Sequence, residues 1–259
     1  MIRMDAEAYT RELAHRAIAE GDATAWFERL YAAAANGEAV VPWDREAPHS
    51  LLAEWAARSL TAGDERPAGS AVPGGDRSAG SAVRGGDRPA ASAVAGDGRR
   101  ALVVGAGLGR DAEFVAGLGF DVVAFDISET AIESARRRHP GSPVRYVAAD
   151  LFDPPGEWIG AFDLVVESMT VQALPDPPRR SAIVQIGRFV ARGGTLLVIA
   201  AGRDPSTVYE GPPWPLTRPE IDAFAVGDLA PTSIEELRDG DAPIFRWRAQ
   251  FLRPTAVSS

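Results

Sequence analysis

The chain has 259 residues, of which 46% are hydrophobic and 24% are charged, a composition typical of a globular protein with one core. Its net charge of −9 argues against a nucleic-acid or anionic-membrane partner, because the phosphates of such a partner would be repelled. The absence of cysteine excludes a disulfide framework, a thiolate metal site and a cysteine nucleophile.

The remaining composition indicates neither a metal nor a membrane. The three histidines, His15, His49 and His139, are scattered and show no spacing with carboxylates that is typical of zinc ligands. The N-terminus lacks the apolar region of a signal peptide, and no apolar run approaches the roughly 18–20 residues that span a bilayer. We therefore expect a cytoplasmic protein without a metal, either a monomer or a dimer.

Residues 1–62 are predicted to form an N-terminal helical lid. Asp5 is a candidate N-cap for helical sequence over 5–35, in which apolar residues recur at helical spacing and Gly21-Asp22 indicates a break. After an irregular stretch, a short helix is expected from His49 to about Leu60, with its leucines and Trp55 on one side.

Residues 63–98 contain three near copies of a segment of about eleven residues, GDERPAGSAVPG, GDRSAGSAVRG and GDRPAASAVAG. Solenoid repeats are usually about twenty residues or longer and need large apolar side chains to stack. These copies offer only alanine and valine, which bury too little surface to offset chain entropy. We therefore predict a disordered linker, followed by a core formed by residues 99–259.

The core alternates strand and helix patterns. Apolar runs predict strands at 101–104, 120–125, 144–148, 162–166, 194–200, 229–237 and 244–252. Helices are expected at 110–118, 128–138, 177–190 and after Pro219. The pattern predicts an α/β fold with a Rossmann-like, doubly wound, seven-stranded and mostly parallel sheet, whose final strand is antiparallel at one side.

The strongest local feature is the glycine-rich turn at 104–109, VGAGLG, between the first core strand and the first core helix. Glycine there permits close approach of a ligand to the backbone and to the helix N-terminus. Asp126 lies twenty-one residues after Gly105, at the tip of the second strand, where a carboxylate accepts hydrogen bonds from both hydroxyls of a ribose. The alternative is that Asp126 caps the helix that follows.

The turn departs from the dinucleotide fingerprint G-x-G-x-x-G, because Arg110 stands where the last glycine would be. Asp111 follows directly, and a carboxylate at this turn disfavours a pyrophosphate but suits a ligand with an ammonium group. An acid at the start of a helix is equally well explained by the helix dipole. Both interpretations of Asp111 are kept.

Two further acids follow strand tips. Asp150 can accept from an adenine amino group while Leu151 and Phe152 pack against the ring. Glu167 is expected at the mouth of the same crevice, where ligands of open α/β sheets bind. Packing alone does not explain three acids at successive strand tips, so the pattern indicates a ligand site.

The core segments LVVGAGLGRDAEFVAGLGFDVVAFDIS, YVAADLFD, FDLVVESMTVQALP and GGTLLV resemble the class I S-adenosylmethionine-dependent methyltransferases. More narrowly, the chain resembles the thiopurine S-methyltransferase and thiol/halide methyltransferase branch. That resemblance lies in the segment GPPWPL at 211–216 and in Pro42-Trp43-Asp44 followed by two leucines, which is similar to a lid that covers the cofactor. It spans roughly residues 26–60 and 100–253.

The resemblance implies S-adenosylmethionine as methyl donor and S-adenosylhomocysteine as product. The three glycines of the turn would line the methionine part, Asp126 would hold the ribose, and Asp150 with Leu151 the adenine. The full set of residues expected at the cofactor is Trp26, Trp43, Gly105, Gly107, Gly109, Asp111, Asp126, Ile127, Asp150, Leu151 and Glu167. The chain departs from the branch at Ser168, where a basic residue is common, and this departure leaves the substrate open.

The expected function is methylation of a small molecule, a thiol or a secondary metabolite, by direct in-line transfer. A soft thiol needs positioning and exclusion of water, whereas a hydroxyl or amine needs a base, for which Asp44, His49 and Glu167 are candidates. An NAD(P)-dependent reductase is the first alternative, although the missing sixth-place glycine and the lack of a Tyr-x-x-x-Lys pair count against it. A non-catalytic binding protein with the same fold is the second.

Overall fold

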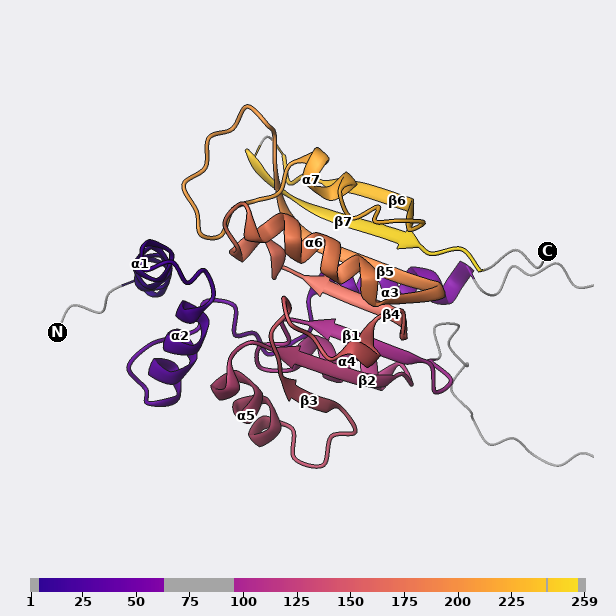
Figure 1. Cartoon of the computed structure of the whole chain (residues 1–259), viewed down its shortest axis with the longest axis horizontal. Helices are drawn as coiled ribbons and strands as arrows, with labels where there is room; N and C mark the ends of the chain where they lie inside the picture. The colour runs from indigo at the N-terminus through magenta and orange to yellow at the C-terminus, as the bar shows by residue number, and fades with distance from the viewer. Residues whose placement is uncertain (1–4, 63–95, 241, 256–259) are drawn as a thin grey trace, which may run out of the picture.

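The computed structural model describes residues 5–62, 96–240 and 242–255 (Figure 1). Nearly all of the predicted linker at 63–98 lies outside these residues. Its disorder, and the division of the chain into lid, linker and core, therefore stay predictions.

The described residues form one seven-stranded sheet with the strand order β3-β2-β1-β4-β5-β7-β6. The first five strands run parallel, whereas β7 pairs antiparallel with both β5 and β6. The strands are β1 (Arg100–Val104), β2 (Asp121–Asp126), β3 (Arg145–Ala148), β4 (Phe162–Ser168), β5 (Val190–Arg203), β6 (Ala230–Leu237) and β7 (Ile244–Leu252). The predicted fold class is confirmed, including the antiparallel final strand.

Helices cover both faces of this sheet, which is why its central strands are continuous apolar runs. In β1, Leu102 and Val104 pack toward one face, while Ala101 and Val103 pack toward the other. The helices are α1 (Ala6–Ala19), α2 (Ala25–Ala35), α3 (Ser50–Ala62), α4 (Arg110–Gly117), α5 (Glu129–Arg138), α6 (Pro178–Phe189) and α7 (Arg218–Asp222), with short 3-10 turns η1 (Gly156–Trp158) and η2 (Val171–Ala173). The predicted break after α1 is present, and Gly21 there has a left-handed φ of 86°.

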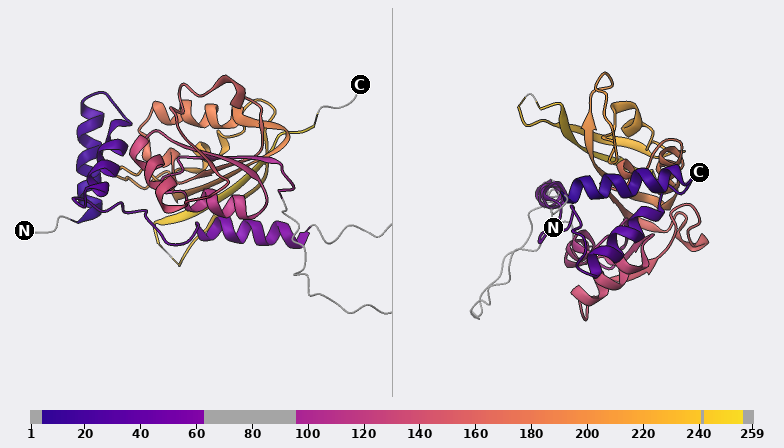
Figure 2. Two further views of the ribbon diagram at one scale, coloured as in Figure 1. Left: turned by 90° about the horizontal axis from the view of Figure 1, so that it is seen from below. Right: turned by 90° about the vertical axis from the view of Figure 1, so that its left-hand side faces the viewer.

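The N-terminal helices occupy two different places. Helices α1 and α2 lie beyond the carboxyl ends of the parallel strands, whereas α3 runs along one face of the sheet (Figures 1 and 2). Leu51 and Leu52 of α3 join the same apolar cluster as Ala101 and Val103 of β1. Only α1, α2 and the segment between α2 and α3 are thus positioned to cover the strand tips.

Helix α2 is fixed to the core by Glu28. Its carboxylate accepts hydrogen bonds from the Ser128 hydroxyl at 2.6 Å, from the Thr130 hydroxyl at 2.5 Å and from the Thr130 amide at 3.2 Å. These donors lie at the N-terminus of α5, where the helix dipole also favours a negative charge. Burial raises the pKa of Glu28, but the hydrogen bonds outweigh this effect, so its pKa lies below the usual 4.5.

We predict that Glu28→Ala lowers the free energy of unfolding by about 1–2 kcal/mol at pH 7, because charge-assisted hydrogen bonds are lost from a partly exposed group. Because the folded-state pKa of Glu28 is lowered, its contribution to the free energy of unfolding is complete above pH 4.5 and disappears as the pH falls through the folded-state pKa. Urea unfolding of the wild type and the variant at several pH values measures this contribution. Glu38→Ala, at an exposed glutamate, is the matched control, and equal losses in both variants would contradict the assignment.

Candidate active site

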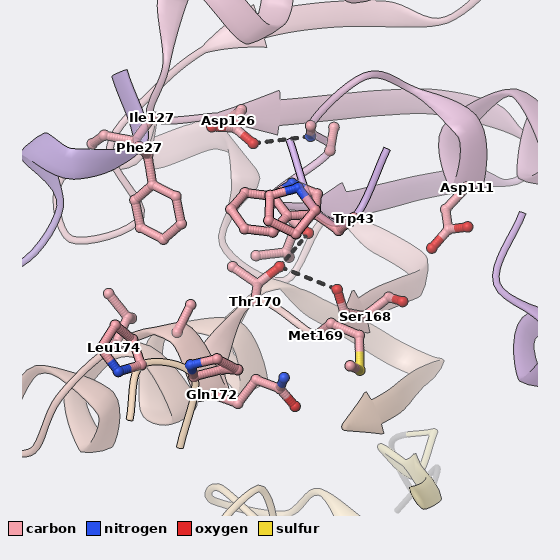
Figure 3. A pocket seen from close by; sticks show the side chains of 18 of the residues that line it. Phe27, Trp43, Asp111, Asp126, Ile127, Ser168, Met169, Thr170, Gln172 and Leu174 are labelled. Carbon is pink, nitrogen blue, oxygen red and sulfur yellow. Dashed lines mark hydrogen bonds between the residues drawn. The ribbon is translucent and has the colours of Figure 1, made fainter. Parts of the chain in front are cut away.

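A cavity of about 470 Å³ lies at the carboxyl edge of the parallel strands, beneath the lid segments (Figure 3). Its walls come from α2 and the segment after it, the glycine turn, the loops after β2, β3 and β4, and the loop between β5 and α7. Because parallel strands end at the same edge, residues from distant parts of the chain meet there.

The backbone and the neighbouring side chains require glycine at three positions of the turn. Gly105, Gly107 and Gly109 have φ values of 61°, 52° and 90°, which L-residues rarely adopt. A Cβ at each of these positions would collide with the protein, at Thr170, Tyr31 and Tyr146 respectively. The three glycines therefore serve the packing of the turn as well as any ligand that approaches it.

Asp126 is buried at the tip of β2 and lines the cavity. Its Oδ2 accepts from the Gly107 amide at 2.9 Å and its Oδ1 from the Ser128 amide at 3.0 Å. Burial raises its pKa, and these two hydrogen bonds oppose that shift. Each carboxylate oxygen has a second lone pair for a ligand hydroxyl. The Gly107 amide is already used, which makes the turn a poor site for a pyrophosphate.

A second group of residues lines the cavity beside β2 and β3. The Asp150 carboxylate is exposed and accepts from the Phe152 amide at 2.8 Å, which shapes the turn after β3. Leu151 is buried, while Phe152 and Ile127 are 41% and 36% exposed. The structure thus brings together the carboxylate and the apolar surfaces predicted to receive an adenine; that role stays a prediction.

Asp111 joins two helices. Its Oδ1 accepts from the His49 amide at 2.8 Å, so it links the start of α4 to the start of α3. It also lines the cavity (Figure 3). This contact supports the interpretation of Asp111 as a helix-start acid, and the ammonium interpretation is still a prediction.

Aromatic side chains of the lid close one wall. Trp26 is buried and stacks on Phe27 with 3.9 Å between ring centroids, and Trp43 meets Trp26 edge to face at 6.0 Å. The Trp43 indole donates to the Tyr31 hydroxyl at 2.8 Å. The sequence analysis missed Phe27 and Tyr31, although Phe27 adjoins Trp26 and Tyr31 follows it by one helical turn.

Glu167 does not line the cavity, contrary to the expectation that it lies at the mouth. Its side chain is fully buried, and Oε1 accepts from the amides of Thr170 and Val171 at 2.8 and 2.9 Å. It thus holds the start of η2, while Oε2 is buried without a partner among the described residues. Burial raises its pKa to about 7. The wall at this point is formed instead by Ser168 and the residues after it.

The other two candidate bases line the cavity but are engaged. Asp44 forms a bidentate pair with Arg138, at 2.7 Å for both contacts, and these hydrogen bonds lower its pKa. His49 accepts at Nδ1 from the Leu51 amide at 3.2 Å, which assigns its proton to Nε2. Burial lowers the pKa of His49, so the imidazole is neutral at pH 7 and its free nitrogen is a donor.

Among the described residues, no group of three His, Asp or Glu side chains is placed to hold a metal ion. No helix in that part of the chain is long and apolar enough to cross a bilayer.

Comparison with known proteins identifies the core. Residues 101–194 match the family model described as a methyltransferase domain. No curated protein matches the chain by sequence.

Solved structures show the same fold. One, from a study of the conversion of a disulfide bond into a thioacetal group during echinomycin biosynthesis, is 20% identical and has a TM-score of 0.60, covering 90% of this chain and 93% of that one. A methyltransferase from Methanosarcina mazei is 18% identical, with a TM-score of 0.51 and coverages of 62% and 94%. Geranyl diphosphate C-methyltransferase from Streptomyces coelicolor A3(2) is 16% identical and has a TM-score of 0.52, covering 61% of this chain and 75% of that one.

Residues 101–194 are therefore identified as a methyltransferase domain, which lies within a sheet of the predicted Rossmann-like order. This domain indicates S-adenosylmethionine as methyl donor and S-adenosylhomocysteine as product, in place of the nicotinamide cofactor of the reductase alternative. The cavity fits this cofactor because its buried carboxylate suits a ribose and its apolar surfaces suit an adenine. The Gly107 amide of the turn is taken by Asp126, which suits a cofactor without a phosphate.

We predict that Asp126→Asn weakens S-adenosylhomocysteine binding by about 1.5–3 kcal/mol, the range for hydrogen bonds to a charged group. Asp150→Asn is expected to cost about 1 kcal/mol, because this carboxylate is exposed. Calorimetric titration measures both, with Asp153→Asn at a neighbouring exposed acid as control. An unchanged affinity in Asp126→Asn would refute the ribose assignment.

Glu167 gives a separate pH prediction. Its folded-state pKa of about 7 exceeds the usual 4.5, so its contribution is complete below pH 4.5 and is lost as the pH rises through 7. Relative to Glu167→Gln, which carries no titrating group there, the wild type is expected to lose about 1–3 kcal/mol of unfolding free energy between pH 5 and 8. Urea unfolding at several pH values measures this loss. The same pH dependence of the unfolding free energy in the wild type and in Glu167→Gln would contradict the assigned pKa, and Glu157→Gln, at an exposed glutamate, is the control.

Proposed function

We propose that this enzyme methylates a small thiol by direct in-line transfer and belongs to the thiopurine and thiol/halide branch. The observation that carries the proposal is the state of the ionisable groups at the cavity. Asp44 is held in an ion pair, His49 offers a donor, and Glu167 is buried outside the cavity. None of the three candidate bases is arranged to remove a proton from a hydroxyl or an amine.

A thiol fits such a site because it ionises near neutral pH without a strong base. Cationic and donor groups at the cavity, Arg45, Arg246 and His49 Nε2, favour the thiolate over the thiol. Polarisable and aromatic side chains, including Phe27, Trp43 and Met169, provide a soft wall for a sulfur atom (Figure 3).

Two similarities support a sulfur acceptor. The neighbour with a TM-score of 0.60 comes from work on the conversion of a disulfide into a thioacetal, which is chemistry at sulfur. The Gly-Pro-Pro segment, typical of the proposed branch, lies at the cavity through Pro212 and Pro213. There it is tied to the lid, because His15 Nε2 lies 2.7 Å from the Gly211 carbonyl oxygen.

When bound, the cofactor supplies an activated methyl group on a sulfonium. The protein contributes binding and orientation, which together account for large rate effects in such reactions. In this proposal Asp126 and Asp150 hold the adenosine end at β2 and β3, while Trp43 beside Gly107 and the Gly-Pro-Pro segment help to exclude water from the cavity. The lid remains in place through the Asp44–Arg138 pair and the Glu28 contacts.

The proposal is tested by following labelled methyl transfer to thiophenol, phenol and aniline, which differ only in the accepting atom. We expect thiophenol to react at least about tenfold faster than the others, with a rate that follows ionisation of the thiol. His49→Gln is expected to keep the thiophenol rate within about tenfold, because a general base contributes 10²–10⁴-fold. Preferred methylation of phenol or aniline, abolished in His49→Gln, would contradict a thiol acceptor.

A further inference from the structure

Among the described residues, three arginines that line the cavity lack a carboxylate within 4.0 Å, namely Arg45, Arg110 and Arg246. Arg110 donates instead to the Arg45 carbonyl oxygen, at 3.0 Å, so Arg45 and Arg246 are considered further. Arg45 follows the Trp43-Asp44 segment and Arg246 lies on β7; both line the cavity. Within the residues that the structure describes, neither guanidinium lies within 4.0 Å of a carboxylate, although thirteen other arginines do. Among these residues the Arg246 side chain donates only to the neighbouring Phe245 carbonyl oxygen, at 3.0 Å.

Arg248 shows that this is not a general property of β7. It lies two residues further along the strand and therefore on the same face. Its buried guanidinium pairs with Glu54 at 3.3 Å and Glu235 at 2.6 Å. In a chain with a net charge of −9, carboxylates are abundant, yet the cation nearer the cavity has none.

The surroundings of Arg246 are unfavourable for an isolated charge. Burial lowers the pKa of its guanidinium, and the charge of Arg45 lowers it further. The three side chains Arg45, His49 and Arg246 line the same cavity. Burial lowers the pKa of His49, the Asp111 carboxylate raises it, and the charges of Arg45 and Arg246 lower it further. A half-buried cation with a cationic neighbour is stabilised when a ligand supplies the negative charge.

This cluster lies on the acceptor side of the site. Arg246 is in register with Ala201 of β5, and the strand order places β5 and β7 on the far side of β4 from β1, β2 and β3. The carboxylates Asp126 and Asp150 follow β2 and β3, whereas Arg246 lies on β7, so this arginine and the two carboxylates come from opposite sides of the sheet.

We propose that Arg45 and Arg246 form an anion subsite that binds a carboxylate, sulfonate or phosphate carried by the methyl acceptor. The proposal rests on the proposed function, since it assigns this end of the cavity to the acceptor. A guanidinium presents a planar pair of donors that matches such groups, and His49 Nε2 adds a further donor beside it. The acceptor is thus a small anion with a separate nucleophilic atom.

The test uses benzoate, benzenesulfonate and phenyl phosphate as probes, with benzamide as the neutral match of benzoate. Each is titrated by calorimetry into the free full-length enzyme and into the enzyme saturated with S-adenosylhomocysteine. We expect the anions to bind more tightly than benzamide and to weaken at higher salt. Arg246→Gln and Arg45→Gln should each weaken benzoate at least about tenfold, with benzamide and S-adenosylhomocysteine within about twofold. Arg188→Gln, at an exposed arginine of α6, should match the wild type.

Three results would overturn the subsite. They are equal binding of benzoate and benzamide, absence of anion binding up to about 10 mM, and unchanged benzoate affinity in both arginine variants. A tenfold loss of S-adenosylhomocysteine affinity in Arg246→Gln without a loss for benzoate would instead assign the arginines to the carboxylate of the cofactor. Failure of the wild type to bind S-adenosylhomocysteine would count against the methyltransferase site alone, because benzoate is also titrated into the free enzyme.

Discussion

The arrangement of the site depends on the buried carboxylate of Asp126. By accepting from the amides of Gly107 and Ser128, it joins the tip of β2 to the glycine turn and to the start of α5. A buried charge is costly, and two amide donors offset part of that cost. The same hydrogen bonds fix the carboxylate at the cavity, so one group both organises the turn and has acceptor positions left for a ligand.

The lid is placed through the same region. Ser128, whose amide donates to Asp126, also donates its hydroxyl to Glu28 of α2, and the far end of α5 holds Asp44 through Arg138. Helix α5 thus contacts the lid at two points, through Ser128 at its N-terminus and through Arg138 at its C-terminus. The signs agree with the helix dipole, since an acid lies at the first end and the paired arginine at the second.

Charged side chains from opposite sides of the sheet line the cavity. Acids follow β2 and β3, where the adenosine is expected, and Arg246 lies on β7, where we place the acceptor. Trp43 and Met169 add apolar and polarisable surfaces to the same cavity. This arrangement agrees with the proposal of an acceptor that is already ionised, because none of the three candidate bases, Asp44, His49 and Glu167, is free to take a proton at the cavity.

The strands of the sheet and the position of Asp126 could be predicted from the sequence. Continuous apolar runs predicted the strands, and the position of Asp126 after the second run predicted its place at the strand tip, because both follow from local pattern. Glu167 was placed wrongly at the mouth, since the pattern locates the end of a strand but not the direction in which its last side chains point.

Other features depend on contacts between distant parts of the chain, which no local pattern encodes. Helix α3 shares its periodicity with the lid helices but packs on the sheet through Leu51 and Leu52. Arg248 has carboxylate partners from α3 and β6, whereas Arg246 has none among the described residues. Tyr31 was detectable as a helical neighbour of Phe27, but its contact with Trp43 was not.

A crystal structure of the complex with S-adenosylhomocysteine would show whether the Asp126 edge of this cavity receives the ribose of the methyl donor. We expect both ribose hydroxyls within about 3.2 Å of the Asp126 carboxylate, with the adenine between Ile127 and Leu151. Adenosine bound at the arginine end of the cavity, or ribose hydroxyls without a contact to Asp126, would contradict it.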